Sequence, residues 1–501
     1  MTPSASIQSV VNPTQLSMLA FNRESARFAK LDQPLIVDNF AGGGGVSLGI
    51  EHAFNRCVDI AINHDPDAIE MHRINHPHTR HAVEDVFDIE IEAICEGRPI
   101  GLAWFSPDCT HHSQARGFKP VDKHIRGLAW IACKYAKIKR PWTIVLENVG
   151  EFKNWSPTIP YIKDGKLQLT SDGKIKYIPD PNKQGFTFKR FVARLRNLGY
   201  RVEWKILNAA DFGAPTARRR FFLIAKADNQ PIYWPQPTHG APDSIEVING
   251  TLKPYRTAAE CINWTLPVKS IFERKKPLVQ KTLRRLAIGT NRFVFHNPNP
   301  YITTVDGEPV STKHLVEANN LIASFLIGAG GPSNSAKPVA ISKPMGTIMP
   351  ENHRALAVVW LAKFYGTAIG CKIDKPLPTI TAGAGGGHMA EVRALLTQYK
   401  DDIEAYCKAN DIREDLILYI NGEPYIIYDI GLRMLTPKEL AQAQFGWDED
   451  GRSLSADYIL TGTQGNQTAK IGNSVPPLIV SAIVKANCPY LIDQDALPLA
   501  A

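Results

Sequence analysis

Closely spaced cysteines are missing from the 501-residue sequence, since its eight cysteines are scattered singly along the chain. This excludes a cysteine-built zinc knuckle and a redox motif, and it argues against a disulfide framework. The sequence also lacks a basic amino-terminal region followed by an apolar stretch, and it has no run of about 18 apolar residues. We therefore expect a soluble, cytoplasmic protein without a membrane partner.

The chain has no strong excess of charge of either sign. It contains 57 Lys and Arg and 49 Asp and Glu, which gives a net charge of +8. A balance of this size favours a nucleic-acid partner only modestly. Apolar residues make up 44% of the chain and charged residues 21%, which excludes disorder throughout. At about 100 to 200 residues per domain, the length predicts two to four domains.

Short apolar runs alternate with turns and amphipathic stretches from Pro34 to about Ala225. This rhythm is typical of βα units on a parallel sheet, whose strands are buried on both faces. The fold class is therefore predicted to be α/β. The expected strands are LIVDNF, CVDIAIN, GLAWFS, TIVLENV and RRFFLIA.

The βα rhythm stops after Trp234, and Pro, Gly and Asn punctuate shorter segments as far as about Tyr425. We expect a second, smaller domain of irregular and β character in this region. Within it the pattern K-P-x-x-T-I begins at Lys343 and again at Lys375, which suggests two similar hairpin-like units.

Two polar segments each allow two interpretations. Between Tyr161 and Gln184, two Asp-Gly pairs suggest an inserted hairpin, although a solvated excursion explains the composition better. The segment Glu273–Arg285 holds six basic residues, for which a solvated surface and a phosphate contact both remain open. Pro277 would interrupt any helix that ran through this second segment.

A strand, a glycine run and a helix are expected in VDNFAGGGGVSLGIEHAF, residues 37–54. Glycines at such a turn permit positive φ angles, and the amides of a helix N-terminus favour negative groups. A nucleotide-like cofactor loop and a purely structural turn both fit this segment. The spacing departs from G-x-G-x-x-G, which disfavours a dinucleotide and hydride chemistry.

Reactive side chains follow two of the expected strands. Cys109 lies in AWFSPDCTHHSQARG, where a thiolate nucleophile and a buried inert thiol are the alternatives. Glu147 follows TIVL, where apolar surroundings would raise the pKa of a carboxyl group toward that of a proton donor, and a capping or ion-paired glutamate is the alternative. His111 and His112 have no third ligand at a familiar spacing, so we predict no metal site.

Three consecutive arginines enter a strand in DFGAPTARRRFFLIA. Alternation sends Arg218 and Arg220 to one face and Arg219 to the other. The matched pair could grip a carboxylate, a phosphate or a base edge, with ordinary surface arginines as the alternative. A last segment, IGNSVPPLIV at residues 471–480, is by itself only a polar turn before an apolar stretch.

Taken in chain order, these segments resemble the motif series of the DNA cytosine-5 methyltransferase family. The matching motifs are DNFAGGGG, SPDCTHHS, ENV, GAPTARRR, KPLPTIT, RMLTPKELAQAQFG and IGNSVPP. They cover roughly Leu35 to Ala225 and Pro376 to Ala486. The unmatched middle corresponds to the place where this family carries its target-recognition domain.

The resemblance implies that Cys109 attacks C6 of a flipped cytosine while Glu147 hydrogen-bonds or protonates N3. C5 then takes a methyl group from S-adenosylmethionine, and loss of the C5 proton and of the thiolate gives 5-methylcytosine. The covalent step is needed because C5 of cytosine is a poor nucleophile until addition at C6 makes an enamine. Arg218 and Arg220 resemble the family's arginine pair, of which one would hold the cytosine O2 or order the active-site loop.

The same resemblance implies where S-adenosylmethionine binds. The positions come from the glycine loop, the end of the second strand, an acidic contact near the adenine, the turn before the nucleophile and the C-terminal motif. They are Phe40, Ala41, Gly42, Gly44, Gly45, Asn63, His64, Asp65, Asp85, Val86, Pro107, Asn473 and Ser474.

The chain departs from the family pattern in three places. The nucleophile loop reads Pro-Asp-Cys instead of Pro-Pro-Cys, and the carboxylate of Asp108 should raise the pKa of the neighbouring thiol unless it is turned away. The second strand ends in Asn63-His64-Asp65, where the family carries an acidic residue for the ribose hydroxyls, and Thr216 replaces the usual Gln before the arginines. The nucleophile, the glutamate and both arginines are retained, so we expect an active enzyme.

The implied architecture is a Rossmann-like S-adenosylmethionine-dependent methyltransferase sheet with a second, smaller target-recognition domain of irregular and β character. In RMLTPKELAQAQFG, Thr436 is expected as the N-cap of a helix that begins at Pro437. The expected parts are a catalytic domain over 30–230, a target-recognition domain over 231–425, a hinge region over 426–465 and a C-terminal segment, 466–501, that returns to the catalytic domain.

Double-stranded DNA is the expected partner, and the protein is expected as a monomer that associates with the nucleoid through DNA. A cognate restriction endonuclease is a further partner that the sequence leaves open. Two alternatives remain beside DNA methylation. One is methylation of cytosine in RNA, and the other is a catalytically weak DNA-binding regulator on the same fold, for which the Pro107-Asp108-Cys109 loop is the main support.

Overall fold

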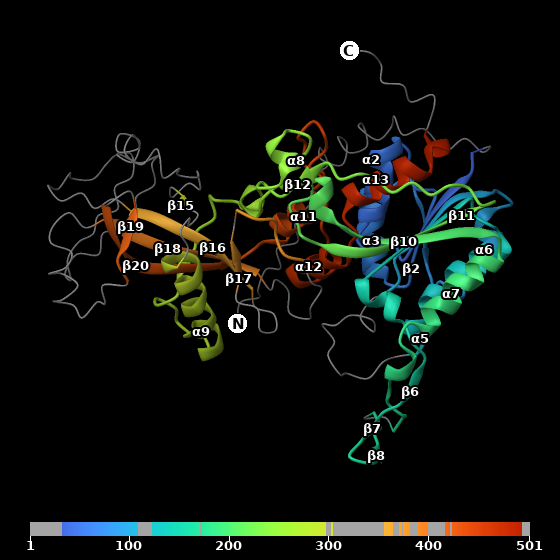
Figure 1. Cartoon of the computed structure of the whole chain (residues 1–501), viewed down its shortest axis with the longest axis horizontal. Helices are drawn as coiled ribbons and strands as arrows, with labels where there is room; N and C mark the ends of the chain where they lie inside the picture. The colour runs from blue at the N-terminus through green and yellow to red at the C-terminus, as the bar shows by residue number, and fades with distance from the viewer. Residues whose placement is uncertain are drawn as a thin grey trace, which may run out of the picture. The chain divides into compact units, whose positions relative to one another are not determined.

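The computed structural model divides into two compact units, residues 1–255 with 444–501 and residues 256–443. These are called the first and the second unit (Figure 1). The four-part division expected from the sequence, with boundaries at 230, 425 and 465, stays a prediction. The structure describes residues 33–108, 123–170, 173–296, 302–303, 355–363, 370–372, 374–380, 389–398, 416–420 and 423–492.

The first unit is built on a seven-stranded sheet in the order β10-β11-β5-β4-β1-β2-β3. Its strands are β1 (Leu35–Asn39), β2 (Ile60–Asn63), β3 (Arg80–Val83), β4 (Ile100–Phe105), β5 (Thr143–Asn148), β10 (Tyr200–Asn208) and β11 (Arg219–Ala227). The five strands expected from apolar runs are all present, and β1 to β5 pair in parallel. This confirms the α/β fold class.

The expectation of a parallel sheet is wrong for one of those five strands. β11 runs antiparallel to β5 on one side and to β10 on the other. The link from β10 to β11 is a short turn, residues 209–218, which contains a 3₁₀ turn and no crossover helix, and so short a link joins only antiparallel strands. β10 and β3 are not indicated by apolar runs, because only Tyr200 and Val202 of β10 are buried and β3 is a partly exposed edge strand.

Both faces of this sheet are covered, as the continuous apolar runs require. One core contains Val37 and Phe105 with side chains of α6 (Ile131–Ile138) and α7 (Phe186–Asn197). The other contains Ile36 and Trp104 with side chains of α2 (Gly45–Phe54) and α13 (Pro477–Asn487). The other helices in the described part of this unit are α3 (Pro66–Asn75), α4 (Ile91–Cys95), α5 (Lys123–Gly127), α8 (Ile245–Ile248) and α12 (Gln464–Asn473).

The C-terminal helix is in close contact with the helix that follows the glycine run. α13 packs on α2 so tightly that a Cβ at Gly49 would lie 2.5 Å from the carbonyl oxygen of Pro477 and 2.6 Å from Val480 Cβ. Gly49 therefore serves helix packing. Within the described residues no helix is both long and apolar enough to cross a membrane.

The second unit contains an antiparallel sheet in the order β14-β20-β18-β16-β15, with β17 beside β16 and β19 beside β20. Its strands are β14 (Lys269–Ser270), β15 (Ile302–Thr303), β16 (Ala355–Lys363), β17 (Gly370–Lys372), β18 (Met389–Gln398), β19 (Leu418–Ile420) and β20 (Glu423–Met434). Helix α9 (Gln280–Thr290) packs on this sheet through Leu286. It begins after Pro277, as that residue requires. The first K-P-x-x-T-I segment lies outside the described residues.

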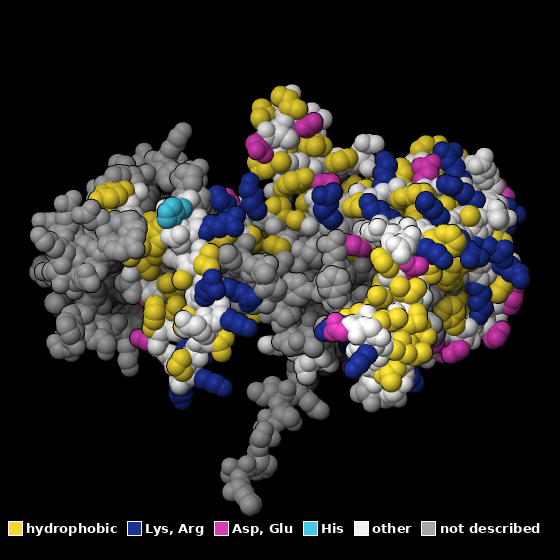
Figure 2. All heavy atoms as spheres, turned by 60° about the horizontal axis from the view of Figure 1, so that its bottom comes forward, with side chains coloured by type: hydrophobic (Ala, Val, Ile, Leu, Met, Phe, Trp, Pro, Cys, Tyr) yellow, Lys and Arg dark blue, Asp and Glu magenta, His cyan; other side chains and the backbone are white. Residues whose placement is uncertain are grey.

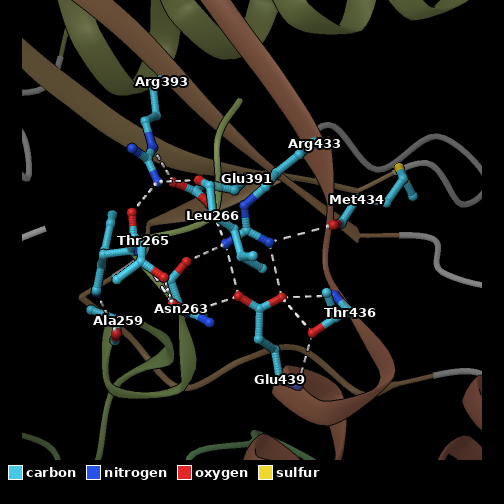
Figure 3. Close-up of polar contacts among 11 residues, drawn as sticks. Ala259, Asn263, Thr265, Leu266, Glu391, Arg393, Arg433, Met434, Thr436 and Glu439 are labelled. Atoms are coloured by element: carbon cyan, nitrogen blue, oxygen red, sulfur yellow. Dashed lines mark hydrogen bonds and ion pairs between the residues drawn. The ribbon is translucent and has the colours of Figure 1, made fainter. Parts of the chain in front are cut away.

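Helix α11 (Pro437–Phe445) begins where it was expected. The backbone N–H of Glu439 donates to Thr436 Oγ1 at 3.3 Å, and the backbone N–H of Thr436 donates to Glu439 Oε2 at 2.7 Å. This reciprocal pair is a capping box, which satisfies amides at the helix N-terminus. The prediction of Thr436 as N-cap is confirmed (Figure 3).

A hairpin extension projects from the first unit between residues 158 and 179 (Figure 1). Its strands are β6 (Thr158–Pro160), β7 (Ile162–Lys163), β8 (Lys166–Leu167) and β9 (Tyr177–Pro179). Asp164 and Gly165 both have positive φ at the turn between β7 and β8, as the tightest hairpin turns require. The inserted hairpin, the less favoured of the two interpretations, is present, and it is largely solvent-exposed.

Candidate active site

The predicted site residues of the first unit gather at one edge of its sheet. β1 to β5 are parallel, so their carboxyl ends share this edge, and β11 begins there because it runs antiparallel to β5. Open α/β sheets bind ligands at the carboxyl ends of their strands. The residues that this topology places at the edge are Phe40 after β1, Asn63 on β2, Asp85 after β3, Pro107 after β4, Glu147 on β5 and Arg220 on β11.

The glycine run makes a tight turn between β1 and α2. Phe40, Gly42 and Gly44 have φ angles of 64°, 34° and 82°. The backbone N–H of Ala41 donates to the Ile62 carbonyl on β2 at 3.0 Å, which ties the turn to the neighbouring strand. Among the described residues, a Cβ at Gly42 would meet only the Phe40 carbonyl, at 3.6 Å. The turn is therefore open at Gly42, as close approach of a ligand requires.

The next glycines of the run are packed against the chain itself. A Cβ at Gly44 would lie 2.0 Å from Tyr458 Oη, and one at Gly45 would lie 2.1 Å from Ser474 Oγ. Tyr458 Oη also donates to the carbonyl of Gly43 at 2.7 Å. Residues near the C-terminus thus pack against the loop, and no motif in the sequence points to Tyr458.

Two of the three residues at the end of β2 are used in local turns. The backbone N–H of Asp65 donates to Asn63 Oδ1 at 2.9 Å, and Asp65 in turn caps α3 by accepting from the backbone N–H of Asp67 at 3.0 Å. His64 is exposed. These two hydrogen bonds use one side-chain oxygen of Asn63 and one of Asp65.

Asp85 and Val86 stand just past the end of β3. The Asp85 carboxylate accepts from the backbone N–H of Phe87 at 2.9 Å, and Val86 is buried. This turn presents an acidic side chain beside an apolar one at the same edge as the glycine turn. The open side at Gly42 and these polar groups fit a nucleoside-bearing cofactor.

Glu147 is buried on the last part of β5, with 6% of its surface exposed. Burial raises the pKa of its carboxyl group, and the positive charges of Arg220 and Arg218 oppose this rise. Arg220 Nε lies 3.2 Å from Glu147 Oε1. A carboxyl group with a raised pKa at a ligand-binding edge has the properties of a hydrogen-bond or proton donor.

The expected alternation of the three arginines is observed. Arg218 and Arg220 both act on Glu147, whereas Arg219 is exposed. Arg218 is buried and donates from Nη1 to the carbonyl of Gly472 at 2.8 Å. It therefore anchors the segment that carries Asn473 and Ser474, of which Asn473 is exposed and Ser474 is buried.

The turn that leads to the predicted nucleophile is tied to β5. Asn148 donates from Nδ2 to the carbonyl of Pro107 at 3.1 Å, so the residue after Glu147 holds the loop after β4. Asn148 belongs to the ENV motif, but its role was not anticipated. Asp108 is exposed. Cys109, His111 and His112 lie outside the described residues.

A chain of buried polar side chains runs behind the glycine turn. Ser47 Oγ donates to Asp38 Oδ2 at 3.0 Å and lies 3.0 Å from His72 Nε2, and His72 Nδ1 lies 2.9 Å from His81 Nε2. Asp38 is fully buried, and this burial raises its pKa from 3.8 to about 7, although the hydrogen bond from Ser47 opposes the rise. No local pattern in the sequence indicates this relay, because its members come from β1, α2, α3 and β3.

Asp38 should make folding stability depend on pH. Because its pKa is raised, the carboxyl group ionises from about pH 4 in the unfolded chain but stays protonated to about pH 7 in the folded protein. The contribution of Asp38 to folding stability is therefore fully present below pH 4 and is lost as the pH rises to 7. At about 1.4 kcal/mol per pH unit, the difference in unfolding free energy between wild type and Asp38→Asn should change by about 4 kcal/mol over this range. Urea unfolding at a series of pH values measures it.

The exposed Asp88→Asn serves as the control for this experiment, since it changes the same functional group on the surface of the same unit. A constant difference between wild type and Asp38→Asn from pH 4 to pH 7 would contradict the prediction.

The fold and the edge of the sheet together define a class. A seven-stranded α/β sheet whose antiparallel β11 places arginines beside a buried glutamate is the Rossmann-like arrangement of a methyltransferase. The model of the C-5 cytosine-specific DNA methylase family matches residues 35–158 and 180–368. The chain belongs to this family, whose members are DNA cytosine-5 methyltransferases with S-adenosylmethionine as the methyl donor.

Several curated relatives are type II methyltransferases. M.AquIA of Picosynechococcus sp. is 28% identical over 247 residues, which are 46% of this chain and 88% of that protein. M1.HphI of Haemophilus parahaemolyticus is 26% identical over 40% of this chain, and M.SacI of Streptomyces achromogenes is 24% identical over 45%. The match spans about half the length of these last two relatives, 48% and 57%.

Solved structures show a distant likeness. The Dnmt2 methyltransferase of S. pombe has a TM-score of 0.42 and 14% identity, with 90% of this chain and 98% of that chain covered. The Entamoeba histolytica methyltransferase EhMeth has a TM-score of 0.41 and 13% identity, with 93% and 99% covered.

Proposed function

We propose that the protein methylates C5 of a flipped cytosine in double-stranded DNA through a covalent bond between Cys109 and C6. The observation that carries this proposal is the buried carboxyl group of Glu147, whose pKa is raised by burial and which is paired with Arg220. The Asn148 side chain supports it, because it ties the turn before Cys109 to the strand that carries Glu147.

The chemistry follows from these groups. The Cys109 thiolate forms a bond to C6 while Glu147 donates a hydrogen bond or a proton to N3, which gives C5 the electron density that it lacks in free cytosine. S-adenosylmethionine, when bound, supplies the methyl group that C5 takes. A base then removes the C5 proton, and the bond between sulfur and C6 breaks to release 5-methylcytosine and the thiolate.

The target base has to leave the duplex, because C5 and C6 are not accessible within stacked base pairs. Flipping requires a few kcal/mol, which contacts with the extruded base and with the phosphates must supply. Arg220, whose side chain is held by Glu147, is the group that we assign to the cytosine O2, and Arg218 positions the C-terminal motif through Gly472.

The cofactor site in this proposal is the glycine turn with the ends of β2 and β3. Phe40, Ala41, Gly42, Gly44 and Gly45 would line the methionine and ribose side, and Asp85 and Val86 the adenine side. Asn63, His64 and Asp65 would supply the polar contacts to the ribose. Pro107, Asn473 and Ser474 complete the set.

The partners are proposed in the same terms. The curated relatives are named type II methyltransferases, which supports a cognate restriction endonuclease as partner. We propose that the chain acts as a monomer on nucleoid DNA, and a mass near 55.5 kDa in light scattering would agree with this oligomeric state.

The proposal is tested with duplex DNA that contains 5-fluorocytosine, because fluorine at C5 blocks the final elimination. Wild type and Cys109→Ala are incubated with labelled S-adenosylmethionine and duplexes of varied sequence. A denaturation-resistant, labelled adduct with wild type alone is expected, and its sequence dependence reports the recognition site. An adduct only with fluorinated RNA, or none with either nucleic acid, would overturn the proposal.

A further inference from the structure

The hairpin extension of the first unit is an addition to the family pattern. The family model matches as far as residue 158 and resumes at residue 180, so residues 159–179 fall in its gap. We call residues 158–179 the arm. Within the described residues it is ordered by main-chain hydrogen bonds, such as those from Tyr161 N to Lys176 O at 2.8 Å and from Gln168 N to Tyr161 O at 2.9 Å.

The register gives the arm two unlike faces. Ile162 is paired with Leu167, and Leu169 with Ile175, so these four side chains share one face. They are unusually exposed for aliphatic residues, at 62%, 47%, 48% and 40%. An aliphatic face left to solvent marks a segment that is not part of a core.

The opposite face is basic. Lys163 is paired directly with Lys166, and alternation along the strands places Lys174 and Lys176 on this same face. Two like charges directly opposite each other destabilise a hairpin, so the Lys163–Lys166 pair does not stabilise the fold of the arm. The arm holds four lysines and two aspartates in all, so its charge is complementary to a polyanion.

The arm is rooted firmly at the active-site edge. The chain passes from Glu147 and Asn148 through a short 3₁₀ turn, Gly150–Asn154, directly into β6. Trp155 at the root is buried, and its carbonyl accepts from the backbone N–H of Thr187 at 3.0 Å. The guanidinium of Arg126 also donates to the carbonyl of Ser156 at 3.1 Å. These contacts hold the root of the arm to the first unit, close in the chain to Glu147.

The surrounding surface has the same sign of charge. Lys and Arg side chains are spread over the face of the first unit shown in Figure 2, where acidic side chains are fewer. A strand rises about 3.3 Å per residue, so an arm with strands of about six residues reaches roughly 20 Å, which corresponds to about six base pairs of duplex.

We propose that the basic face of the arm binds the phosphates of duplex DNA beside the target base, on a flank of about six base pairs that the recognition site does not include. This inference rests on the proposed function, since it requires DNA to lie at the edge that carries Glu147. The arm adds affinity that does not depend on the flanking sequence, because phosphate contacts position a protein without reading bases.

The test compares Lys163→Gln/Lys166→Gln with Lys137→Gln/Lys189→Gln, which removes two exposed lysines from α6 and α7 and so changes the net charge equally. DNA affinity is measured against salt concentration for duplexes of about 30 and about 8 base pairs that share a centre, since the shorter one ends about four base pairs from the centre and so short of the arm's reach of about six. On the long duplex, the arm variant should lower the slope of log K against log salt by up to about 2, at roughly 0.9 per lost phosphate contact. The control variant should keep the wild-type slope.

Equal slopes for both variants on the long duplex would overturn the proposal. An equal loss on the short duplex would also overturn it, because the contact would then lie within the recognition site. Replacement of residues 159–178 by a short Gly-Ser linker is the second variant, and it should reproduce the loss if the basic face acts as a unit. Binding of a protein instead of DNA by the aliphatic face, with an unchanged salt slope, would count against the proposal.

The two proposals fail in different experiments. The salt dependence of DNA binding can be measured without methyl transfer. If no duplex forms the 5-fluorocytosine adduct, random-sequence duplexes of the same two lengths are used instead. A missing adduct with a normal difference between the slopes of the two variants would overturn the proposed activity alone. A normal adduct without that difference would overturn only the role of the arm.

Discussion

Exchange of Glu147 for glutamine is expected to lower the rate of methyl transfer by about 10²- to 10⁴-fold, the usual contribution of a positioned acid or base. Glutamine keeps the size of the side chain and an oxygen that can accept from Arg220 Nε, which lies 3.2 Å from Glu147 Oε1, but it cannot release a proton. Single-turnover rates with saturating DNA and cofactor measure the chemical step directly. Affinity for S-adenosylmethionine should stay within a few-fold, because the glycine turn is untouched.

The pH profile separates a proton donor from a merely structural glutamate. Burial raises the pKa of Glu147, and an acid acts only while protonated, so the wild-type rate should fall as the pH rises through that pKa. The Glu147→Gln variant should lack this descending limb. Glu151→Gln, four residues further along the same segment, is the matched control and should retain both the rate and the limb. A Glu147→Gln variant with the wild-type rate and profile would contradict the assignment.

Much of the first unit could be predicted because its buried strands are continuous apolar runs. β1, β4 and β5 are buried along their whole length, and their sequences show it. β10 could not be found in this way, because only Tyr200 and Val202 of its residues are buried. The antiparallel direction of β11 was also missed, since an apolar run carries no information about strand direction.

The predicted site residues show the same division between local and spatial information. Strand alternation alone placed Arg218 and Arg220 on one face, and both act on Glu147 in the structure. Contacts between distant segments had no such local signal. The contact of Tyr458 with the glycine turn and the relay from Asp38 to His81 join residues that only the fold brings together.

The glycine run illustrates why a motif cannot be interpreted residue by residue. Gly42 leaves space on the side open to a ligand, whereas Gly45 and Gly49 make room for Ser474, Pro477 and Val480. Gly44 and Gly45, the second half of the run, therefore also make room for Tyr458 and Ser474. A single sequence shows four glycines in a row. It does not reveal which of them leave space for a ligand and which leave space for other parts of the chain.

Removal of the Glu391 carboxylate should lower the unfolding free energy of the second unit more than a substitution at its surface. Glu391 on β18 is fully buried and pairs with Arg393 and with Arg433, which lies 2.7 Å away on β20 (Figure 3). Arg433 also binds Glu439 at 2.7 Å, so the cluster joins both central strands to the first turn of α11. Loss of one partner from a buried ion pair destabilises by about 3–5 kcal/mol, because the remaining charge is left without compensation in a dry site.

Glu391→Ala is therefore expected to lower the unfolding free energy of the second unit by about 3–5 kcal/mol. Hydrogen exchange of the β18 and β20 amides during urea titration reports on this unit within the full chain. Glu273→Ala, at an exposed position of the same unit, should change stability by less than about 0.5 kcal/mol. The double variant Glu391→Ala/Arg393→Ala should lose less than the sum of the two single changes, since the partners are coupled. Strict additivity, or a loss for Glu391→Ala no larger than that for Glu273→Ala, would show that the cluster does not hold the sheet to α11.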